Sequence, residues 1–253
     1  MRALIIIPCY NEASRLDTRA FLDFTARHQG IHFLFVNDGS SDDTASIINA
    51  LASKSSNSMS VLHLPKNGGK AEAVRRGFLH GFTLKPELIG FLDADLASPL
   101  NTILELETAL RQENKDIAMA SRIILLGRQI ERNPARHYAG RFFATAASMI
   151  LGLRVYDTQC GAKLFRVTER LKSVFAAPFT VKWIFDVEIL ARFMITEKNG
   201  AAPVSDICLE YPLKEWVDKK GSKLRAVDFL TSGLDLVKIY FLMKQKNLPV
   251  PAP

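Results

Sequence analysis

The stretch "GFLDADLASP" (residues 90–99) ends a short apolar run with two carboxylates, Asp93 and Asp95, which stand one residue apart. In an extended chain the side chains of such a pair point to the same side, where their charges repel unless a cation lies nearby. One interpretation is a capping turn, because Pro99 begins a helical pattern and Asp often precedes helices. The other interpretation is a site for a divalent metal ion.

Short apolar runs alternate with helical patterns on both sides of this stretch. The expected strands are 3–7, 31–36, 60–64, 88–92 and 116–120. The expected helices between them are 13–28, 43–53, 70–83 and 100–113. This alternation predicts an α/β fold with a mostly parallel central sheet flanked by helices. The continuous apolar strands fit a sheet that is buried on both faces.

Each of the first four predicted strands is followed by a polar loop. The loops are "PCYNE" (8–12), "NDGSSDDT" (37–44), "PKNGGK" (65–70) and "DADLASP" (93–99). Because ligands of open α/β sheets bind beyond the carboxyl ends of the strands, these loops predict a single shared cleft.

After residue 121 the pattern changes to mixed α and β. We expect a helix over 135–155, a strand pair over 155–167, a helix over 185–198, a strand over 203–213 and a final helix over 226–244. The final helix has apolar residues at positions 227, 230, 234, 237 and 241. This amphipathic spacing predicts a stripe that faces either the core or a membrane surface.

The composition suits one large folded domain of 253 residues in a reducing compartment. Three scattered cysteines (Cys9, Cys160 and Cys208) favour neither a disulfide framework nor a zinc cluster. The apolar part of the N-terminus is too short for a signal peptide. No run approaches the roughly 18–20 apolar residues that cross a bilayer.

Positive charge is concentrated in one segment. Residues 119–172 hold ten Lys or Arg and three Asp or Glu, so they alone account for the net charge of +7. Such a local field suits anionic partners, such as nucleotide or lipid phosphates or an anionic membrane, and a solvated basic face is the alternative.

Several site types are excluded by their missing patterns. The first strand is not followed by GxGxxG, and "NGGK" (67–70) lacks the spacing of a phosphate-binding P-loop. The five histidines show no ligand spacing, and no GxSxG elbow is present. Basic-aromatic strands typical of nucleic-acid modules are also missing, so we expect no nucleic-acid partner.

Four segments in this order resemble the family 2 glycosyltransferases, which have the GT-A fold. They are "IPCYNE" (7–12), "VNDGSSDDT" (36–44), "NGGKAEAVRRGF" (67–78) and "FLDADL" (91–96). The later segments "DTQCGAKLF" (157–165), "WIFDVEIL" (183–190) and "GSKL" (221–224) resemble dolichyl-phosphate β-glucosyltransferases and bacterial polyprenyl-phosphate relatives. The resemblance covers about residues 3–240. It implies a single catalytic domain over 1–253, with a nucleotide-sugar half (1–121), an acceptor-side half (122–246) and a tail (247–253).

The resemblance also implies a donor site. Asp95 would bind Mg²⁺ or Mn²⁺, and Asp93 would face the ribose or the water shell of the metal. Asp38 would hydrogen-bond the nucleotide base. Lys70 would contact an anion at a helix start, or else be a surface lysine. The remaining expected donor-side residues are Pro8, Tyr10, Asn11 and Glu12 as pocket walls and Lys223 in a loop that closes over the diphosphate.

On the acceptor side, two mechanisms stay open. A lipid phosphate arrives already ionised, whereas an alcohol needs a base to take its proton. Asp157 and Asp186 are the candidate bases, although Asp186 could instead cap a helix. Lys163 and Arg166 are expected to hold an acceptor phosphate. Arg122 resembles a family position near the donor or acceptor.

We therefore predict a metal-dependent, inverting hexosyltransferase that moves glucose from UDP-glucose to a polyprenyl phosphate. Polyprenyl-phosphate mannosyltransferases carry Gln where this chain has Ala97, so GDP-mannose is the less favoured donor. The alternatives are a soluble sugar or glycolipid hydroxyl as acceptor, a nucleotidyltransferase, and a non-catalytic membrane adaptor. We expect a cytoplasmic protein, with peripheral contact to the inner membrane face through the segment 138–153, and infer no protein partner.

Overall fold

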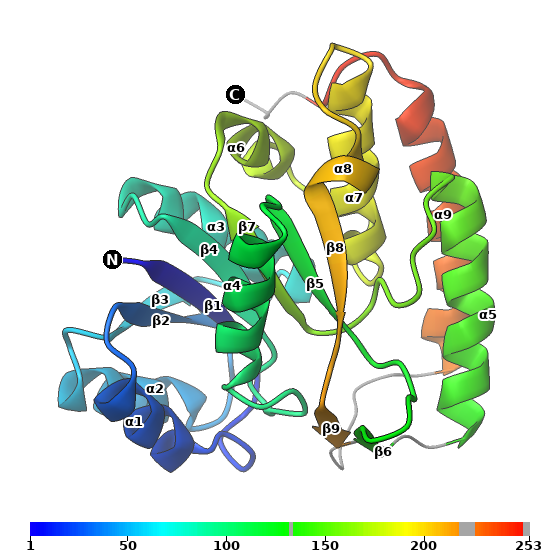
Figure 1. The fold of residues 1–253 in the computed structure, drawn as a ribbon. Coiled ribbons are helices and arrows are strands. Elements are labelled where there is room, and N and C mark those ends of the chain that lie inside the picture. Colours follow the sequence, from blue (N-terminus) through cyan, green and yellow to red (C-terminus); the bar gives the residue numbers. More distant parts are fainter. Residues whose placement is uncertain (132–133, 218–225, 250–253) are drawn as a thin grey trace.

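The computed structural model describes the backbone of residues 1–131, 134–217 and 226–249, and the side chains of the same residues apart from 134–139 and 226–230. Within these residues, seven strands form one sheet in the order β3-β2-β1-β4-β7-β5-β8 (Figure 1). These strands are β1 (Ala3–Cys9), β2 (Ile31–Asp38), β3 (Met59–Leu64), β4 (Leu88–Leu92), β5 (Ile117–Ser121), β7 (Ala162–Arg166) and β8 (Cys208–Pro212). The short strands β6 (Gln129–Glu131) and β9 (Glu215–Val217) pair with each other in parallel.

The central sheet is parallel except around β7. This strand lies between β4 and β5 and runs antiparallel to both. Both β7 and β8 come from the second half of the chain, yet they join strands of the first half. The structure therefore confirms the predicted α/β fold, with its mostly parallel central sheet and a mixed second half.

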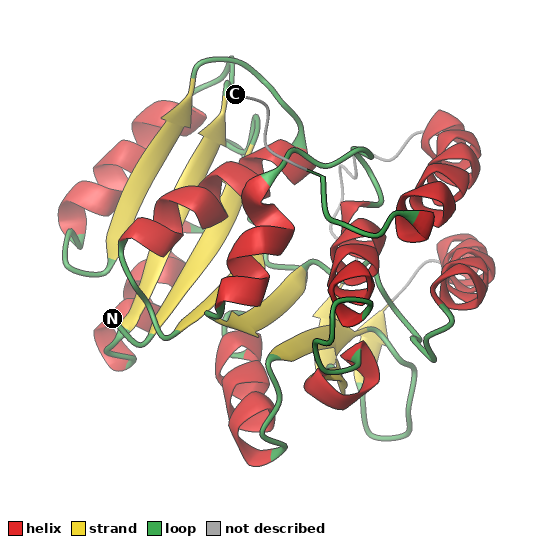
Figure 2. Cartoon of the chain, turned by 90° about the horizontal axis from the view of Figure 1, so that it is seen from above, coloured by secondary structure: helices red, strands yellow, loops and turns green. Residues whose placement is uncertain are grey.

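Helices cover both faces of the sheet (Figure 2). They are α1 (Thr18–Arg27), α2 (Thr44–Lys54), α3 (Lys70–Thr83), α4 (Thr102–Gln112), α5 (Pro134–Leu151), α6 (Glu169–Ala176), α7 (Phe185–Glu197), α8 (Val204–Ile207) and α9 (Ala226–Lys244). One apolar cluster joins α1, α2 and α4 to Ile5 and Ile7 of β1. The other joins α3, α6 and α7 to Leu4 and Ile6, because alternate side chains of a strand point to opposite faces.

Helices α5 and α9 form an outer layer on the second face. They contact each other, and both contact α7, which lies between them and the sheet (Figure 1). Of the helices in the part of the chain that the structure describes, none is long and apolar enough to cross a membrane.

Two glycines set how closely α3 approaches the sheet. A Cβ atom at Gly77 would lie 2.7 Å from the side chain of Ile6, and one at Gly81 would lie 2.5 Å from that of Leu4. Any larger residue would push the helix outward, because these contacts are shorter than packed carbon atoms allow. The spacing therefore fixes the place of Lys70 in the first turn of α3.

Two predicted strand segments are wrong in part. Only Ala162–Arg166 of the expected strand pair over 155–167 forms a strand, and the preceding residues form a loop whose polar groups bond to Arg122 and Glu210. The expected strand over 203–213 begins with one turn of helix, α8, which follows Pro203, and only then continues as β8. Alternation of apolar residues does not distinguish a strand from a loop with long-range bonds.

Of the apolar stripe predicted on the final helix, positions 227 and 230 lie outside the described side chains, and the other three residues do not face the core. Leu234, Val237 and Phe241 are 67%, 50% and 64% exposed, whereas Leu236 and Ile239 are buried. The helix is apolar on both sides, so spacing alone could not identify the buried one. The helix expected over 135–155 ends earlier, at Leu151, because Gly152 takes the left-handed conformation (φ +64°).

A buried ion pair on α7 holds the segment that leads into this helix. Glu188 and Arg192 are completely buried and lie 2.7 Å apart. The Glu188 carboxylate accepts hydrogen bonds from the backbone N–H groups of Thr180 and Val181. The Arg192 guanidinium donates to carbonyl oxygens of the segment 174–178. Both charges are thus paired and hydrogen-bonded, the condition under which buried charges are tolerated.

We expect the substitution Arg192→Leu to lower the free energy of unfolding by about 3–5 kcal/mol, since it leaves a buried carboxylate without its cation. Urea denaturation followed by circular dichroism measures this loss. The matched control is Arg166→Leu, which breaks a half-exposed pair with Asp116 and should cost about 0–1 kcal/mol. Equal losses in the two variants would contradict the role given to the α7 pair.

Candidate active site

A cavity of about 460 Å³ opens at the carboxyl edge of the sheet. Its walls come from the ends of β1, β2, β4 and β5, the start of α3, the loop 156–161, the start of α7 and parts of α5 and α9. A cavity of this size can enclose most of a small-molecule ligand. The loops after the first four strands do share one cleft, as their sequence predicts.

Most of the predicted site residues line this cavity. They are Pro8, Tyr10, Glu12, Asp38, Lys70, Asp93, Asp95, Arg122, Asp157 and Asp186. Three others, Asn11, Lys163 and Arg166, are not part of its lining. Lys223 lies outside the residues that the structure describes.

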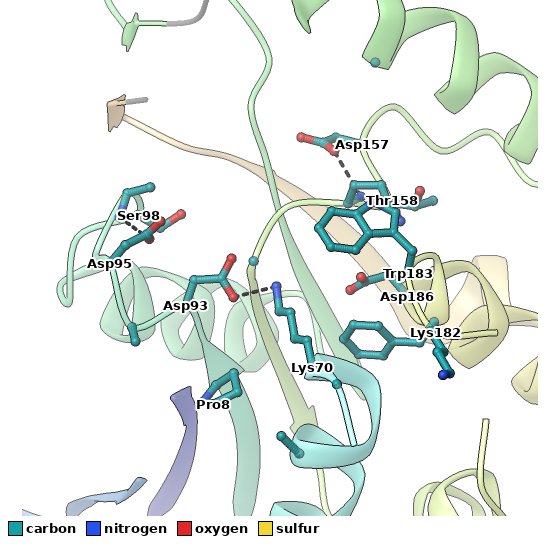
Figure 3. A pocket seen from close by; sticks show the side chains of 18 of the residues that line it. Pro8, Lys70, Asp93, Asp95, Ser98, Asp157, Thr158, Lys182, Trp183 and Asp186 are labelled. Carbon is teal, nitrogen blue, oxygen red and sulfur yellow. Dashed lines mark hydrogen bonds and ion pairs between the residues drawn. The ribbon is translucent and has the colours of Figure 1, made fainter. Parts of the chain in front are cut away.

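Asp93 and Asp95 lie just beyond the end of β4 (Figure 3). Asp93 forms an ion pair with Lys70, with 2.6 Å between Oδ1 and Nζ. Asp95 accepts a hydrogen bond from the backbone N–H of Ala97. Burial, and then the negative charge of Asp93, raise the pKa of Asp95 above its ordinary value. The repulsion expected between the two carboxylates is therefore present, and Lys70 relieves part of it.

Lys70 is held by several negative charges at once. Burial acts to lower the pKa of Lys70, but the carboxylates of Asp93, Asp186 and Asp95 outweigh it and raise that pKa. Lys70 projects from the start of α3 toward Asp93, with Asp186 on its other side (Figure 3). The lysine is therefore part of the cavity wall rather than a solvated surface residue, and its contact with an anionic ligand stays a prediction.

Gly161 brings the loop 157–161 against Asp93. The carbonyl oxygen of Gly161 accepts a hydrogen bond from the Asp93 N–H at 3.0 Å. A Cβ atom at position 161 would lie 2.0 Å from Asp93 Oδ2, so any other residue would displace the Asp93 carboxylate from its present position. The glycine therefore allows the loops 93–99 and 157–161 to meet in one site.

Asp38 organises the turn before α3. Its two carboxylate oxygens accept hydrogen bonds from the N–H groups of Gly68 and Gly69, each at 2.8 Å. Burial raises the pKa of Asp38, although these two N–H groups act to lower it. The observed role is to position the start of α3, and contact with a nucleotide base stays a prediction.

Asn11 joins two of the loops without facing the cavity. It has φ +50°, and its Oδ1 accepts a hydrogen bond from the Ser41 N–H at 2.9 Å. Glu12 lines the cavity and pairs with Arg15 at 2.6 Å. Asn11 thus supports the wall that Tyr10 and Glu12 form.

On the other side of the cavity, Asp157 is bound to Arg122. The Nε and Nη2 atoms of Arg122 donate to the two carboxylate oxygens at 2.6 and 2.8 Å, and its backbone N–H donates as well. The guanidinium also lies 5.4 Å from the ring centre of Trp216. This bidentate geometry fixes the end of β5 against the loop 156–161.

Glu210 on β8 does not line the cavity but holds the loop that does, and sequence reasoning missed it. Its carboxylate oxygens accept hydrogen bonds from the N–H groups of Tyr156 and Asp157, each at 2.7 Å. Burial raises the pKa of Glu210 above its ordinary value. An acidic residue within the apolar segment "CLEYP" (208–212) was the signal that could have found it.

Lys163 lies beneath the cavity rather than in it. Lys163 is 2% exposed, and its ammonium group donates to Asp186 and to the carbonyl oxygens of Thr158 and Cys160. An acceptor phosphate cannot reach this group while these partners surround it. The structure therefore contradicts the expected phosphate contact of Lys163, which instead holds Asp186 and the loop 157–161 together. Asp186 lies in the first turn of α7 and is not its N-cap.

Arg166 is at the wrong end of the sheet for the expected phosphate contact. It pairs with Leu88 at the start of β4, whereas the cavity lies beyond the end of that strand. Its guanidinium is 3.5 Å from Asp116. The prediction failed because it placed β7 without knowing that this strand runs antiparallel to its neighbours.

Arg141 of α5 lines the cavity and was also missed. Its guanidinium lies 3.6 Å from the ring centre of Tyr156 and donates to the carbonyl oxygen of the same residue. Lys182 and Trp183, just before α7, complete this side (Figure 3). The excess of basic residues over 119–172 was the signal for Arg141, although it did not point to one position.

The sequence of the chain matches known proteins over most of its length. Residues 4–170 match the family described as Glycosyl transferase family 2. The chain is 32% identical over 247 residues to a dolichyl-phosphate beta-glucosyltransferase of Trichomonas vaginalis, covering 92% of this chain and 69% of that protein. It is 31% identical to the Saccharomyces cerevisiae dolichyl-phosphate beta-glucosyltransferase, covering 93% and 73%. A polyprenol monophosphomannose synthase of Mycolicibacterium smegmatis is 25% identical, covering 90% and 84%.

Solved structures with the same fold are more distant in sequence. Glucosyl-3-phosphoglycerate synthase of Mycobacterium tuberculosis, crystallised with Mn²⁺, UDP-glucose and phosphoglyceric acid, superimposes with a TM-score of 0.65. The identity is 16%, and the match covers 98% of this chain and 80% of that one. At this identity the likeness concerns the fold, which is the predicted GT-A fold.

The family match and the two relatives above 30% identity agree with the motifs from which the resemblance was predicted. The chain belongs to glycosyl transferase family 2, and it is a glycosyltransferase.

Proposed function

We propose that this enzyme transfers glucose from UDP-glucose to a polyprenyl phosphate, with inversion at the anomeric carbon and dependence on a divalent metal ion. The choice of a phosphate acceptor rests on one observation: the carboxylates of both candidate bases are already bonded to basic side chains. Asp157 binds Arg122 through both carboxylate oxygens, and Asp186 binds the buried ammonium of Lys163. A base must have an oxygen within reach of the proton it removes. An acceptor that is already ionised avoids this requirement.

A phosphate monoester supplies such an acceptor, because its second pKa is about 6. One of its oxygens would form the new bond to the anomeric carbon, while the bond from that carbon to the diphosphate oxygen breaks. UDP leaves with the electron pair of the broken bond. No proton has to move in this step, so the carboxylates of this chain are needed for binding and positioning.

The choice of glucose and UDP rests on relatives. Two proteins above 30% identity are named dolichyl-phosphate beta-glucosyltransferases. The structural neighbour from Mycobacterium tuberculosis was crystallised with UDP-glucose. Ala97 occupies the position where mannosyltransferases carry Gln, which favours glucose over mannose in the same family.

Asp93 and Asp95 are the residues that would hold Mg²⁺ or Mn²⁺. Both ions prefer carboxylate oxygen, and Mg²⁺ often takes few protein ligands and completes its shell with substrate phosphates and water. Among the described residues, no cluster of three or more His, Cys, Asp or Glu side chains could hold a metal ion. The carboxylate pair beside an open cavity fits this mode of binding. A bound ion would neutralise the charge of the leaving diphosphate.

Lys70 would bind the diphosphate of the donor, and Arg141 would bind the phosphate of the acceptor from the opposite side of the cavity. Lys70 neutralises Asp93 in this structure, and its ammonium faces the cavity where a diphosphate would lie. Arg141 lines the acceptor side next to Tyr156 and takes the role first expected of Lys163 and Arg166. We further propose that the enzyme works peripherally at the cytoplasmic face of a membrane, where polyprenyl phosphates are anchored.

A transfer assay tests this function directly. The purified chain receives radiolabelled UDP-glucose, Mg²⁺ or Mn²⁺ and undecaprenyl phosphate in detergent, with GDP-mannose in parallel. We expect label in the organic phase from UDP-glucose, and its loss with EDTA. Organic-phase label from GDP-mannose alone would refute UDP-glucose as the donor. UDP release without organic-phase label would refute a polyprenyl phosphate as the acceptor.

The substitution Asp157→Asn distinguishes a phosphate acceptor from an alcohol. If Asp157 only positions Arg122, the variant should lose activity but keep the shape of the pH profile of kcat/KM. The measurement is transfer to undecaprenyl phosphate between pH 6 and 9, with Asp186→Asn as the parallel variant. A loss of kcat/KM that is restored at high pH would show that the replaced aspartate removes a proton from the acceptor, and would contradict an ionised acceptor.

The substitution Arg141→Gln tests the acceptor side. Losing a charge-assisted hydrogen bond to phosphate should raise KM for the prenyl phosphate about tenfold or more. KM for UDP-glucose should stay unchanged, because the contacts of Arg141 are with Tyr156 of the loop 156–161 and not with Asp93 or Lys70. Arg27→Gln on α1, far from the cavity, is the control. A rise in KM for UDP-glucose instead would place Arg141 on the donor side.

A further inference from the structure

The outer layer of α5 and α9 exposes large apolar side chains. On α5, Phe142 and Met149 are 81% and 79% exposed. On α9, the exposed apolar residues are Leu234, Val237, Tyr240 and Phe241. Together these six residues define what we call the α5/α9 face. Soluble proteins rarely gather this many exposed large apolar groups unless something covers them.

The exposure on α9 is not a fault of packing. Leu236, Ile239 and Leu242 are buried on the inner side, where α9 contacts α7. The helix therefore has a second apolar side that the fold leaves open. Ordinary surface helices have a polar outer side, as α1 does with Arg19 and Asp23.

The charges around the α5/α9 face are basic. Lys238 and Lys244 on α9 are exposed, and so is Arg154 just after α5. Asp235 is 8% exposed and pairs with Lys238 at 2.6 Å. Among the described side chains of 140–154 and 231–246, no exposed one is acidic. Apolar side chains with basic residues around them complement an anionic bilayer surface.

The face is continuous with the cavity. Arg141, Phe143 and Ala144 of α5 line the cavity, as does Ser232 of α9. The adjacent Phe142 points outward and is almost fully exposed. A molecule that lay with its tail along the α5/α9 face could therefore place its head group at Arg141.

We propose that the α5/α9 face docks on an anionic lipid bilayer, with its apolar side chains at the boundary between head groups and acyl chains. Docking would bring the cavity mouth to the membrane, so that a prenyl phosphate reaches Arg141 without leaving the bilayer. This purpose rests on the proposed lipid acceptor, but docking itself does not depend on catalysis. A second copy of the chain is the less suitable occupant, because two copies of one basic face would repel each other.

Vesicle flotation tests the docking. The full chain is mixed with vesicles of phosphatidylcholine alone or with 30% phosphatidylglycerol, at low and high salt. The variants are Phe142→Ser with Phe241→Ser, and the control Leu84→Ser, which removes an exposed apolar residue at the end of α3. We expect the wild type and the control to float with anionic vesicles, and the double variant to bind at least about tenfold more weakly. High salt should weaken binding by the wild type.

Two further measurements separate the outcomes. Circular dichroism and UDP binding, which none of these side chains touches, should be unchanged in the double variant. Transfer to a short, water-soluble prenyl phosphate should also be unchanged, while transfer to vesicle-borne undecaprenyl phosphate falls. Equal flotation of all variants would overturn the docking face, as would a dimer in light scattering that the double variant disrupts. Flotation without any transfer would refute the proposed function and leave the docking in place.

Discussion

The side of the cavity formed by α7 and the loop 157–161 depends on one buried cation. The side chain of Lys163 is buried, so the charge of its ammonium group must be satisfied by protein groups. It is satisfied by Asp186 from α7 and by two carbonyl oxygens of the loop 157–161. It also lies 5.2 Å from the ring centre of Phe91 on β4. A helix, a loop and the centre of the sheet are thus held at fixed distances, and the cavity forms above them.

The antiparallel strand β7 is what makes this arrangement possible. By entering between β4 and β5 it carries Lys163 into the centre of the sheet and delivers the preceding loop to the carboxyl edge. There the loop meets Asp93 through Gly161, Arg122 through Asp157, and Glu210 through two backbone N–H groups. The cavity residues of the two halves of the chain are therefore joined in one bonded framework.

The first half could be predicted because its signals are local. Parallel strands are apolar throughout, and their loops gather at one edge whatever the exact register. The second half could not, because its loop is fixed by bonds between residues far apart, such as Arg122 with Asp157 and Tyr156 with Glu210. Alternation identified the two faces of β7 but not its direction, so Arg166 was assigned to the wrong edge. A buried lysine and an exposed lysine also look identical in sequence, and only the partners distinguish them.

The apolar pattern of α9 was ambiguous for a physical reason that bears on function. A helix that packs on the protein with one side and contacts lipid with the other needs apolar residues on both sides. Its sequence alone does not show which of the two sides is buried. On α5, one turn likewise has one side that faces the protein and one side that faces outward. Successive residues of a helix point about 100° apart, so Arg141 faces the cavity while Phe142 faces outward. With the proposed acceptor, this one turn of α5 would make two contacts. Arg141 would bind the phosphate, and Phe142 would contact the bilayer around it.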